Sequence, residues 1–356
     1  MLLKPKECER CELWGTGSGF SNWDGDGSSG IAIMAEALGE HEEREGLPLR
    51  PYAPAGSILH RALHIARLER AGIACYNTIQ CRPPRNWLVG APWEFAAIRH
   101  CQVHRQRFID QFKPRVIVAL GNVAMQALTD FAGAGKEGIS YGRGFVMKLM
   151  GYGHECCVIP AYHPSFVLQS GNRSMGVLVS DLSLARRTAI SGFEEHHREY
   201  QTGIGLDDLI AFHNRVKDNV NRPLSYDIEN PITQEIDEED RDEDFTTEIT
   251  SIQFSLFPYE GIFAPWTPEM IPWIKRIMAM GNEKIGFNNW DHDDPRLKAR
   301  GVAIQGPVYD MMWAWHHAQP DLPRGLQFVA SMNGMDFPWK HLSGREPEIY
   351  GCADVD

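Results

Sequence analysis

Four cysteines near the start of the chain have spacing suited to holding a metal. Cys8 and Cys11 form a CxxC pair, Cys81 lies in the segment YNTIQCRPP at 76–84, and Cys101 follows 20 residues later. The turn in a CxxC pair lets both thiolates face one ion or one cluster. Two further cysteines can close the same site. We therefore predict a four-thiolate centre, which the residues alone do not assign to zinc or to an iron-sulfur cluster.

Carboxylates form a second candidate group in the last third of the chain. Asp227 and Glu229 lie two residues apart in PLSYDIENP at 223–231. Alternate residues of a strand face the same side, so the two carboxylates converge. Two pairs with a spacing of four residues follow, Asn289 with Asp293 and Tyr350 with Asp354. Clustered carboxylates suit Mg²⁺ or Mn²⁺, although Asp227 and Glu229 on their own are explained more simply by a solvated strand.

Alternating strands and helices must position these residues in the first half. The apolar run at 30–39 predicts a buried parallel strand, and 55–68 has apolar residues at helical spacing. Residues 114–128 indicate strand, turn and helix, and 156–164 a strand that runs into a loop. This alternation predicts an α/β fold with a parallel sheet covered on both faces, whose ligands collect at the strand ends. In the second half, apolar runs at 249–257 and 261–266 predict an antiparallel meander.

Composition limits the domain number and the cellular setting. With 356 residues and 43% hydrophobic content, two domains are the better expectation. The sequence has no signal-peptide pattern and no run of roughly 18 apolar residues that would span a bilayer. We therefore expect a cytoplasmic protein without membrane contacts. The remaining cysteines are then expected to be buried thiols: Cys75, Cys156, Cys157 and Cys352.

The net charge of -12 would ordinarily count against a nucleic-acid partner. Much of this acid lies in one run, QEIDEEDRDEDFTTE at 234–248, which predicts a solvated loop. Bound metal would neutralise further carboxylates. The rest of the chain is close to balanced, so the charge remains compatible with DNA binding.

Four segments of the first half together resemble the family 4, iron-sulfur uracil-DNA glycosylases. They are AEALGEHEEREGLPLRPYAPAGSIL at 35–59, YNTIQCRPP at 76–84, PRVIVALG at 114–121 and PAYHPSFVLQ at 160–169. The resemblance covers residues 1 to about 190. It implies a three-layer α/β/α domain and a 4Fe-4S cluster, with zinc as the alternative. The implied ligands are Cys8, Cys11, Cys81 and Cys101.

The resemblance also implies roles in uracil excision, which requires the base to leave the stack and be held by its pairing edge. Asn77 would read uracil and reject cytosine, because a mispaired amide leaves buried polar groups unsatisfied. Tyr52 would stack on the base, and His163 would donate toward O2 of the departing uracil. Glu36 and Glu40 would position or deprotonate the attacking water.

One departure from the family pattern favours a competing hypothesis. The first motif usually begins GEAPG, whereas this chain has Ala35 and Leu38 at the first and fourth of these positions. Ala35 cannot adopt glycine-only backbone angles, and Leu38 in place of proline is expected to loosen the loop. The first domain would then be a non-catalytic module that binds DNA or a partner.

The second half resembles the DEDD-type 3'-5' exonuclease domains of family A DNA polymerases, in the subtype with tyrosine in the third motif. The resemblance implies a ribonuclease H-like fold that hydrolyses DNA with two Mg²⁺ or Mn²⁺ ions. The implied metal ligands are Asp227, Glu229, Asp293 and Asp354, with Asp291 as the alternative to Asp293. Tyr350 would orient the water, Asn289 would contact substrate, and Asp310 would be a structural partner.

The order of the two domains resembles the N-terminal part of phage-type family A polymerases. We expect a glycosylase-like domain at 1–190, a connector at 191–222 and an exonuclease domain at 223–356 that is incomplete at its C-terminus. Asp354 would then be poorly fixed, because only two residues follow it. The expected partners are uracil-containing DNA, DNA 3' ends and a DNA polymerase, fused or separate.

Overall fold

A computed structural model describes residues 3–231 and 248–356, where the chain forms two compact units. The first unit comprises Met1–Glu194 with Ala330–Pro338, and the second comprises Glu195–Val329 with Trp339–Asp356. The acidic run at 234–248 lies outside the described residues except for Glu248. Among the described residues, no helix is long and apolar enough to cross a membrane.

Within the described residues, the first unit is built on a five-stranded sheet of order β2-β1-β3-β5-β4. Neighbours among β2, β1, β3 and β5 are parallel, and only β4 runs antiparallel, at the edge. The fully buried apolar runs explain these strands, since both faces of a parallel sheet are covered. The strands are β1 (Ile31–Ala37), β2 (Ala74–Ile79), β3 (Val116–Leu120), β4 (Met147–Lys148) and β5 (Cys157–Ala161).

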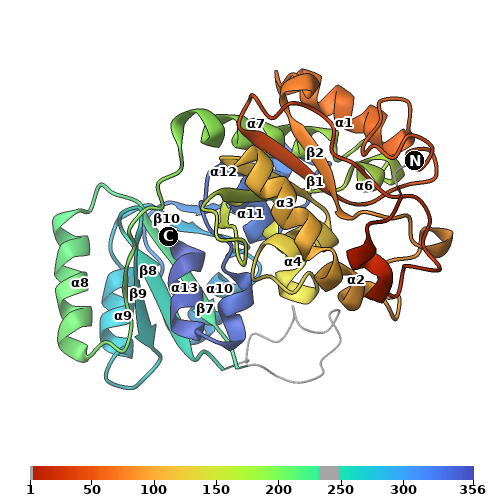
Figure 1. Cartoon of the computed structure of the whole chain (residues 1–356). Coiled ribbons are helices and arrows are strands. Elements are labelled where there is room, and N and C mark those ends of the chain that lie inside the picture. Colours follow the sequence, from red (N-terminus) through yellow and green to blue (C-terminus); the bar gives the residue numbers. More distant parts are fainter. Residues whose placement is uncertain (1–2, 232–247) are drawn as a thin grey trace. The chain divides into compact units, whose positions relative to one another are not determined.

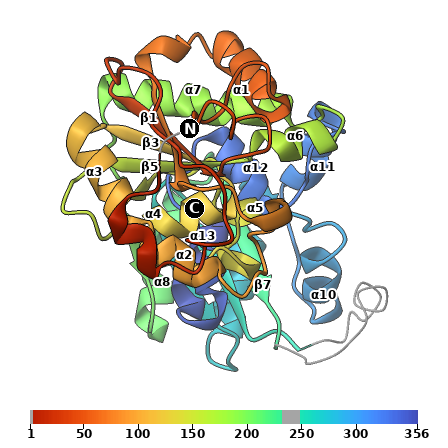
Figure 2. The same ribbon diagram turned by 45° about the vertical axis from the view of Figure 1, so that its right-hand side comes forward.

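Helices cover both faces of this sheet, as Figure 2 shows for α1 and α7 on one side and α3 and α4 on the other. The apolar side chains of α3 and α4 pack with alternate residues of β1, β2 and β3 in one core cluster. The predicted three-layer α/β/α arrangement is therefore confirmed. The helices are α1 (Pro54–Ile65), α2 (Glu94–His100), α3 (Gln102–Phe112), α4 (Asn122–Leu128), α5 (Ile139–Gly142), α6 (Pro164–Gln169) and α7 (Met175–Ser191).

The second unit has a six-stranded sheet of order β11-β10-β7-β8-β9-β6 among its described residues. β7, β8 and β9 form the predicted antiparallel meander, and β10 and β11 add in parallel to β7. This mixed arrangement agrees with the predicted ribonuclease H-like fold. The strands are β6 (Glu199–Gln201), β7 (Leu224–Glu229), β8 (Ser251–Ser255), β9 (Glu260–Pro265), β10 (Lys284–Gly286) and β11 (Val308–Asp310).

The two faces of this sheet differ in chemistry. Leu224, Tyr226 and Ile228 of β7 are buried in the core with the apolar faces of α8 and α9, whereas Asp227 and Glu229 point to the other face, where α13 packs. Figure 1 shows α8 and α9 on one side of β7–β9 and α13 on the other. The helices are α8 (Leu206–Asp218), α9 (Ile271–Met278), α10 (Asp293–Ala299), α11 (Met311–Ala318) and α13 (Pro347–Val355). A further helix, α12 (Leu326–Asn333), begins in this unit and ends in the segment Ala330–Pro338 of the first unit.

The C-terminal helix α13 packs closely against the sheet. A Cβ on Gly261 of β9 would lie 2.9 Å from Cys352 Cβ, so the missing side chain makes room for the helix. The Asp356 carboxylate accepts hydrogen bonds from Arg198 Nε at 2.9 Å and Tyr200 Oη at 2.9 Å. The expectation that Asp354 is poorly fixed because only two residues follow it is therefore wrong, since the sheet and these polar contacts of Asp356 hold the helix.

The segment predicted as a connector at 191–222 contributes structure of its own. Residues 199–201 form β6 at the edge of the second sheet, and α8 buries Leu209, Phe212 and Val216 in the core. The apolar spacing of α8 is that of an amphipathic helix. Most of this segment therefore belongs to the second unit.

Candidate functional site

Polar residues collect where parallel strands of the first sheet end. Asn77 lies near the end of β2 and pairs in register with Ala35 of the neighbouring β1, which also carries Glu36. Gly121 directly follows β3, and His163 lies two residues beyond β5. The carboxyl ends of these strands meet at one edge of the sheet. This edge is where ligands of open α/β sheets bind.

His163 is held as a neutral ring with a defined donor. Burial lowers the pKa of His163 to about 4, so the imidazole is uncharged at pH 7. The backbone N–H of Ser165 donates to His163 Nδ1 at 3.2 Å. A neutral ring that accepts at Nδ1 carries its proton on Nε2. His163 therefore offers an Nε2–H donor.

Gly121 allows the His163 loop to approach β3. Its φ of +85° lies in the left-handed region, and a Cβ there would stand 3.4 Å from His163 Cβ. The Gly121 N–H also donates to the carbonyl of Ala161 at 2.9 Å. A side chain at this position would strain the backbone and crowd the imidazole.

Asn77 is buried and has a neighbour that the sequence did not indicate. Its Nδ2 lies 3.4 Å from Ser21 Oγ, a residue 56 positions earlier in the chain. Ser21 in turn donates from its hydroxyl to the carbonyl of Asn22 at 3.0 Å. The N-terminal segment therefore folds back to orient the amide, a contact that no local motif reveals.

The two candidate glutamates lie in different surroundings. Glu36 is largely buried at the end of β1, and burial raises the pKa of its carboxyl, with Glu94 adding to the effect. Glu40 has an exposed side chain that pairs with Arg82 at 3.2 Å. A carboxyl with a raised pKa is a better proton acceptor, so Glu36 is the stronger candidate for activating water.

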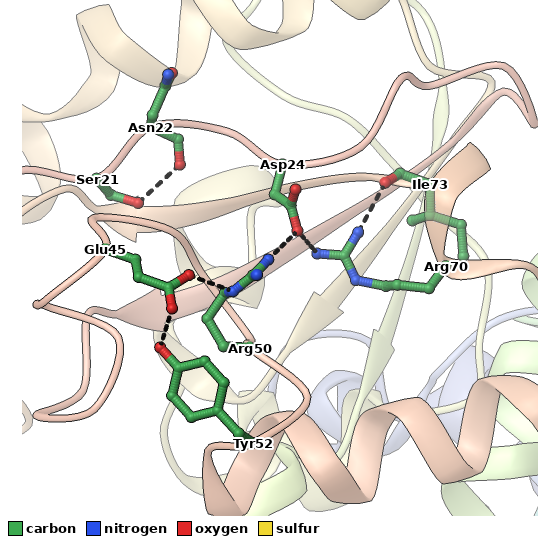
Figure 3. Close-up of polar contacts among 8 residues, drawn as sticks. All are labelled: Ser21, Asn22, Asp24, Glu45, Arg50, Tyr52, Arg70 and Ile73. Carbon is green, nitrogen blue, oxygen red and sulfur yellow. Dashed lines mark hydrogen bonds and ion pairs between the residues drawn. The ribbon is translucent and has the colours of Figure 1, made fainter.

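Tyr52 forms its hydrogen bonds with nearby residues of the segment that precedes α1, and Figure 3 shows its contact with Glu45. Its hydroxyl donates to Glu45 Oε1 at 2.9 Å, and the ring is 56% exposed. Glu45 also forms an ion pair with Arg50, with 2.9 Å between Glu45 Oε2 and Arg50 Nε, and Arg50 continues the network to Asp24. The loop before α1 is thus tied together by charge. The stacking role of Tyr52 stays a prediction.

Ala35 and Leu38, the two departures from the family pattern, both have defined surroundings. Ala35 lies within β1 in regular strand conformation, so no glycine-only backbone angle is required there. Leu38 is buried, and the Glu42 carboxylate accepts from the Gly39 N–H at 2.9 Å. Arg82 adds an ion pair to Glu43 at 3.0 Å. The expectation of a loosened loop stays a prediction beside these contacts.

The predicted cysteine ligands gather on one side of the first unit. Cys81 and Cys101 are buried in one small cluster against which Cys11 packs, and burial followed by the nearby thiols Cys101 and Cys11 raises the pKa of Cys8 to about 11. His104 adds an unpredicted contact, with Nε2 at 3.2 Å from Cys8 Sγ. Because such buried thiols stay protonated in the absence of metal, metal binding would release their protons.

The spacing of these sulfur atoms bears on which metal centre fits. No three of the four sulfurs lie within 4.8 Å of one another, all four cysteines being among the described residues. Four thiolates around zinc at about 2.3 Å would have to lie about 3.8 Å apart. A 4Fe-4S cluster has one iron at each thiolate and so does not require this close approach of the sulfurs.

Three carboxylates meet on the face of the second sheet where α13 packs. Oxygens of Asp227, Glu229 and Asp354 lie within 4.8 Å of one another. Burial and the neighbouring acids raise the pKa of Asp227, and burial followed by Asp354 raises the pKa of Glu229 to about 7. A divalent cation among them would relieve this repulsion, so the donor set fits Mg²⁺ or Mn²⁺.

Asp293 borders this group from the start of α10. It is buried, and its Oδ1 accepts from the backbone N–H of Ile228 at 2.9 Å, between the two acidic residues of β7. The alternative, Asp291, instead accepts from Trp313 Nε1 at 3.3 Å. The geometry therefore favours Asp293 as the fourth carboxylate.

Two other predicted residues have structural partners. Asn289 is fully buried and donates from Nδ2 to Tyr226 Oη at 2.9 Å, and Tyr226 faces away from Asp227. The substrate-binding role predicted for Asn289 is therefore not supported. Asp310 accepts from the backbone N–H groups of Asn288 at 3.0 Å and Met312 at 2.9 Å, which agrees with a structural role.

Lys340 also belongs to this site, although the sequence analysis did not predict it. Its Nζ donates to both oxygens of Asp354, at 2.8 and 2.9 Å, and to Tyr350 Oη at 2.9 Å. Trp339 Nε1 also donates to Asp354. A lone lysine ten residues before Tyr350 has no motif that would mark it.

Comparison with known sequences covers the first unit. The family model described as the uracil DNA glycosylase superfamily matches residues 23–182. The type-4 uracil-DNA glycosylase of Saccharolobus solfataricus is 30% identical over 164 residues, 46% of this chain and 73% of that protein. The protein of the same description from Thermotoga maritima is 30% identical over 182 residues, 51% of this chain and 88% of that protein.

Comparison with solved structures returns an EXD2 exonuclease domain. It is 13% identical, and the match covers 44% of this chain and 82% of that domain with a TM-score of 0.25.

Proposed function

This chain belongs to the type-4 uracil-DNA glycosylase family, and on that basis we propose that its first unit hydrolyses the bond between uracil and deoxyribose in DNA. His163 carries the proposal. Its neutral ring presents an Nε2–H donor at the sheet edge that also holds Asn77 and Glu36. Such a donor stabilises negative charge on uracil O2 as the base departs.

Other residues near this edge of the first sheet would bind the uracil and activate the water. Asn77 binds the pairing edge of the flipped uracil, and Ser21 orients its amide. Glu36 orients the attacking water and takes a proton from it. Tyr52, in the loop before α1, is our candidate for stacking on the base.

We also propose that the four cysteines hold a 4Fe-4S cluster. The burial of Cys8, Cys81 and Cys101 and the membership of this chain in the type-4 family support this assignment. When bound, the cluster would crosslink the N-terminal loop, the end of β2 and the junction of α2 and α3. Because Cys81 lies four residues after Asn77, the crosslink would also fix the strand that carries the uracil-reading amide.

Excision rates of matched variants test the glycosylase proposal. His163→Ala and Asn77→Ala should each lower the rate on single-stranded uracil DNA by roughly 10-fold to 1,000-fold, the range expected when such a donor is removed. His60→Ala, an exposed histidine of α1, is the matched control and should leave the rate unchanged. Binding of this DNA by the wild type without abasic product would instead support a non-catalytic module.

We further propose that the second unit removes nucleotides from DNA 3' ends. The meeting of Asp227, Glu229 and Asp354, with Asp293 beside them, carries this proposal. Two Mg²⁺ or Mn²⁺ ions held there would supply an activated water and stabilise the leaving 3' oxygen. Tyr350 would direct that water at the phosphate, since Lys340 fixes its hydroxyl.

Metal-dependent shortening of a 5'-labelled strand tests the second proposal. The wild type should shorten it only with Mg²⁺ or Mn²⁺, and Asp227→Ala should abolish the reaction, because this carboxylate is the most central of the group. Asp207→Ala, on the exposed side of α8, is the control. Equal shortening by wild type and Asp227→Ala would refute the assignment. We propose a DNA polymerase, fused or separate, as the partner that supplies the 3' ends.

A further inference from the structure

Lys340 places a fixed positive charge inside the carboxylate site. Its side chain is only 18% exposed, and an ammonium group has three hydrogens to donate. All three have partners within the site, namely Asp354 Oδ1, Asp354 Oδ2 and Tyr350 Oη. The ammonium is therefore held by Asp354, which is proposed to bind metal, and by Tyr350, which is proposed to orient the water.

These bonds restrict how Asp354 can bind an ion. A carboxylate offers about four lone-pair positions. Oδ1 accepts from both Lys340 and Trp339, and Oδ2 accepts from Lys340. One position remains, on Oδ2, so Asp354 can give a divalent cation one oxygen while Lys340 stays in place.

The charge of the site indicates a competition between Lys340 and the metal ions. Asp227, Glu229, Asp354 and Asp293 together carry four negative charges when ionised, which the two proposed divalent cations would balance. Lys340 adds one further positive charge beside Asp354, so its charge opposes binding of those ions. Tyr350 accepts from Lys340, so its own hydroxyl hydrogen remains available for a water or a phosphate oxygen.

We propose that Lys340 is a resident cation of this site: it shares Asp354 with the divalent ion, limits that carboxylate to one-oxygen coordination, and positions Tyr350 as a donor. This inference rests on the proposed exonuclease function. In this proposal, the charge of Lys340 weakens metal binding, whereas its position assists cleavage by holding Tyr350. Removal of the ammonium should therefore move metal affinity and cleavage rate in opposite directions.

The experiment compares Lys340→Met with the wild type by Mn²⁺ titration without DNA, and by 3' cleavage at saturating Mn²⁺. The variant should bind Mn²⁺ about tenfold more tightly, because a repelling charge beside the ion is gone. Cleavage should fall at least about tenfold, because Tyr350 is no longer positioned. Lys217→Met, an exposed lysine of α8, should change neither quantity.

Lys340→Arg separates charge from position and covers the case in which Lys340→Met fails to fold. The arginine keeps the charge but cannot reproduce one nitrogen bound to three oxygens, so Mn²⁺ affinity should match the wild type while cleavage falls. Weaker or unchanged Mn²⁺ binding by folded Lys340→Met, or tighter binding by Lys340→Arg, would overturn the inference. Wild-type protein that neither binds Mn²⁺ nor cleaves would instead refute the exonuclease proposal.

Discussion

His163 links the proposed chemistry to the stability of the first unit. Its folded pKa of about 4 lies below the ordinary value of 6.5, so below pH 6.5 the unfolded chain binds more protons. The contribution of neutral His163 to the free energy of unfolding is therefore complete above pH 6.5, and it is lost as the pH falls toward 4. Between pH 6.5 and about pH 5 the loss should amount to about 2 kcal/mol.

Urea unfolding at several pH values measures this loss. His163→Gln removes the titrating ring, so its unfolding free energy should lack this part of the pH dependence. The difference between wild type and variant should then narrow by about 2 kcal/mol as the pH falls to about 5. Parallel pH curves for the two proteins would show that His163 is not buried as a neutral ring.

At the residue scale, prediction from sequence depends on whether the chemistry lies in a local motif. The four cysteines and the carboxylates Asp227 and Glu229 could be proposed because CxxC spacing and strand alternation are local patterns. Ser21 and Lys340 could not, because each acts through a contact made only when distant segments fold together. The substrate-binding role predicted for Asn289 is not supported, because spacing alone does not show that its amide bonds to Tyr226 in the fold.

At the element scale, α13 determines whether two site residues are in place. A Cβ on Gly261 would lie 2.9 Å from Cys352 Cβ and 3.2 Å from its Cα, so Gly261→Ala must push the helix outward. Asp354 and Tyr350 are both residues of that helix. A shift of about 1 Å can cost on the order of 100-fold in rate. We expect Gly261→Ala to slow 3' cleavage about tenfold or more, with uracil excision unchanged.

A second glycine in the same unit provides the control. A Cβ on Gly281 meets nothing within 4 Å, so Gly281→Ala should leave 3' cleavage as it is in the wild type. Both variants should be checked for folding by thermal melting before the rates are compared. Equal cleavage rates for the two variants would show that α13 tolerates displacement or does not carry site residues.

The elements themselves were predictable where apolar patterns are strong. The buried runs of β1 and β3 and the alternation with helices indicated the parallel sheet of the first unit. The role of α13 was not foreseen, because its fixation depends on the glycine of a distant strand and on contacts of Asp356 with residues near 200. The segment at 191–222 was underestimated for the same reason, since α8 gains its packing partners only in the folded sheet.

At the scale of the whole molecule, the two DNA reactions proposed for this chain have different requirements. Excision in the first unit would use the neutral His163 and a carboxyl, without a divalent ion. Hydrolysis in the second unit would need Mg²⁺ or Mn²⁺ among its carboxylates. A chelator that removes exchangeable divalent ions should therefore separate the reactions without any mutation.

A single assay can detect both proposed reactions and separate them by their need for metal. A 5'-labelled single strand with one internal uracil is incubated with the wild-type chain in EDTA, and separately with Mn²⁺. In EDTA the strand should keep its full length and acquire an alkali-labile site at the uracil position, whereas Mn²⁺ should add progressive shortening from the 3' end. A strand that stays alkali-stable in EDTA, or that shortens there, would contradict the account.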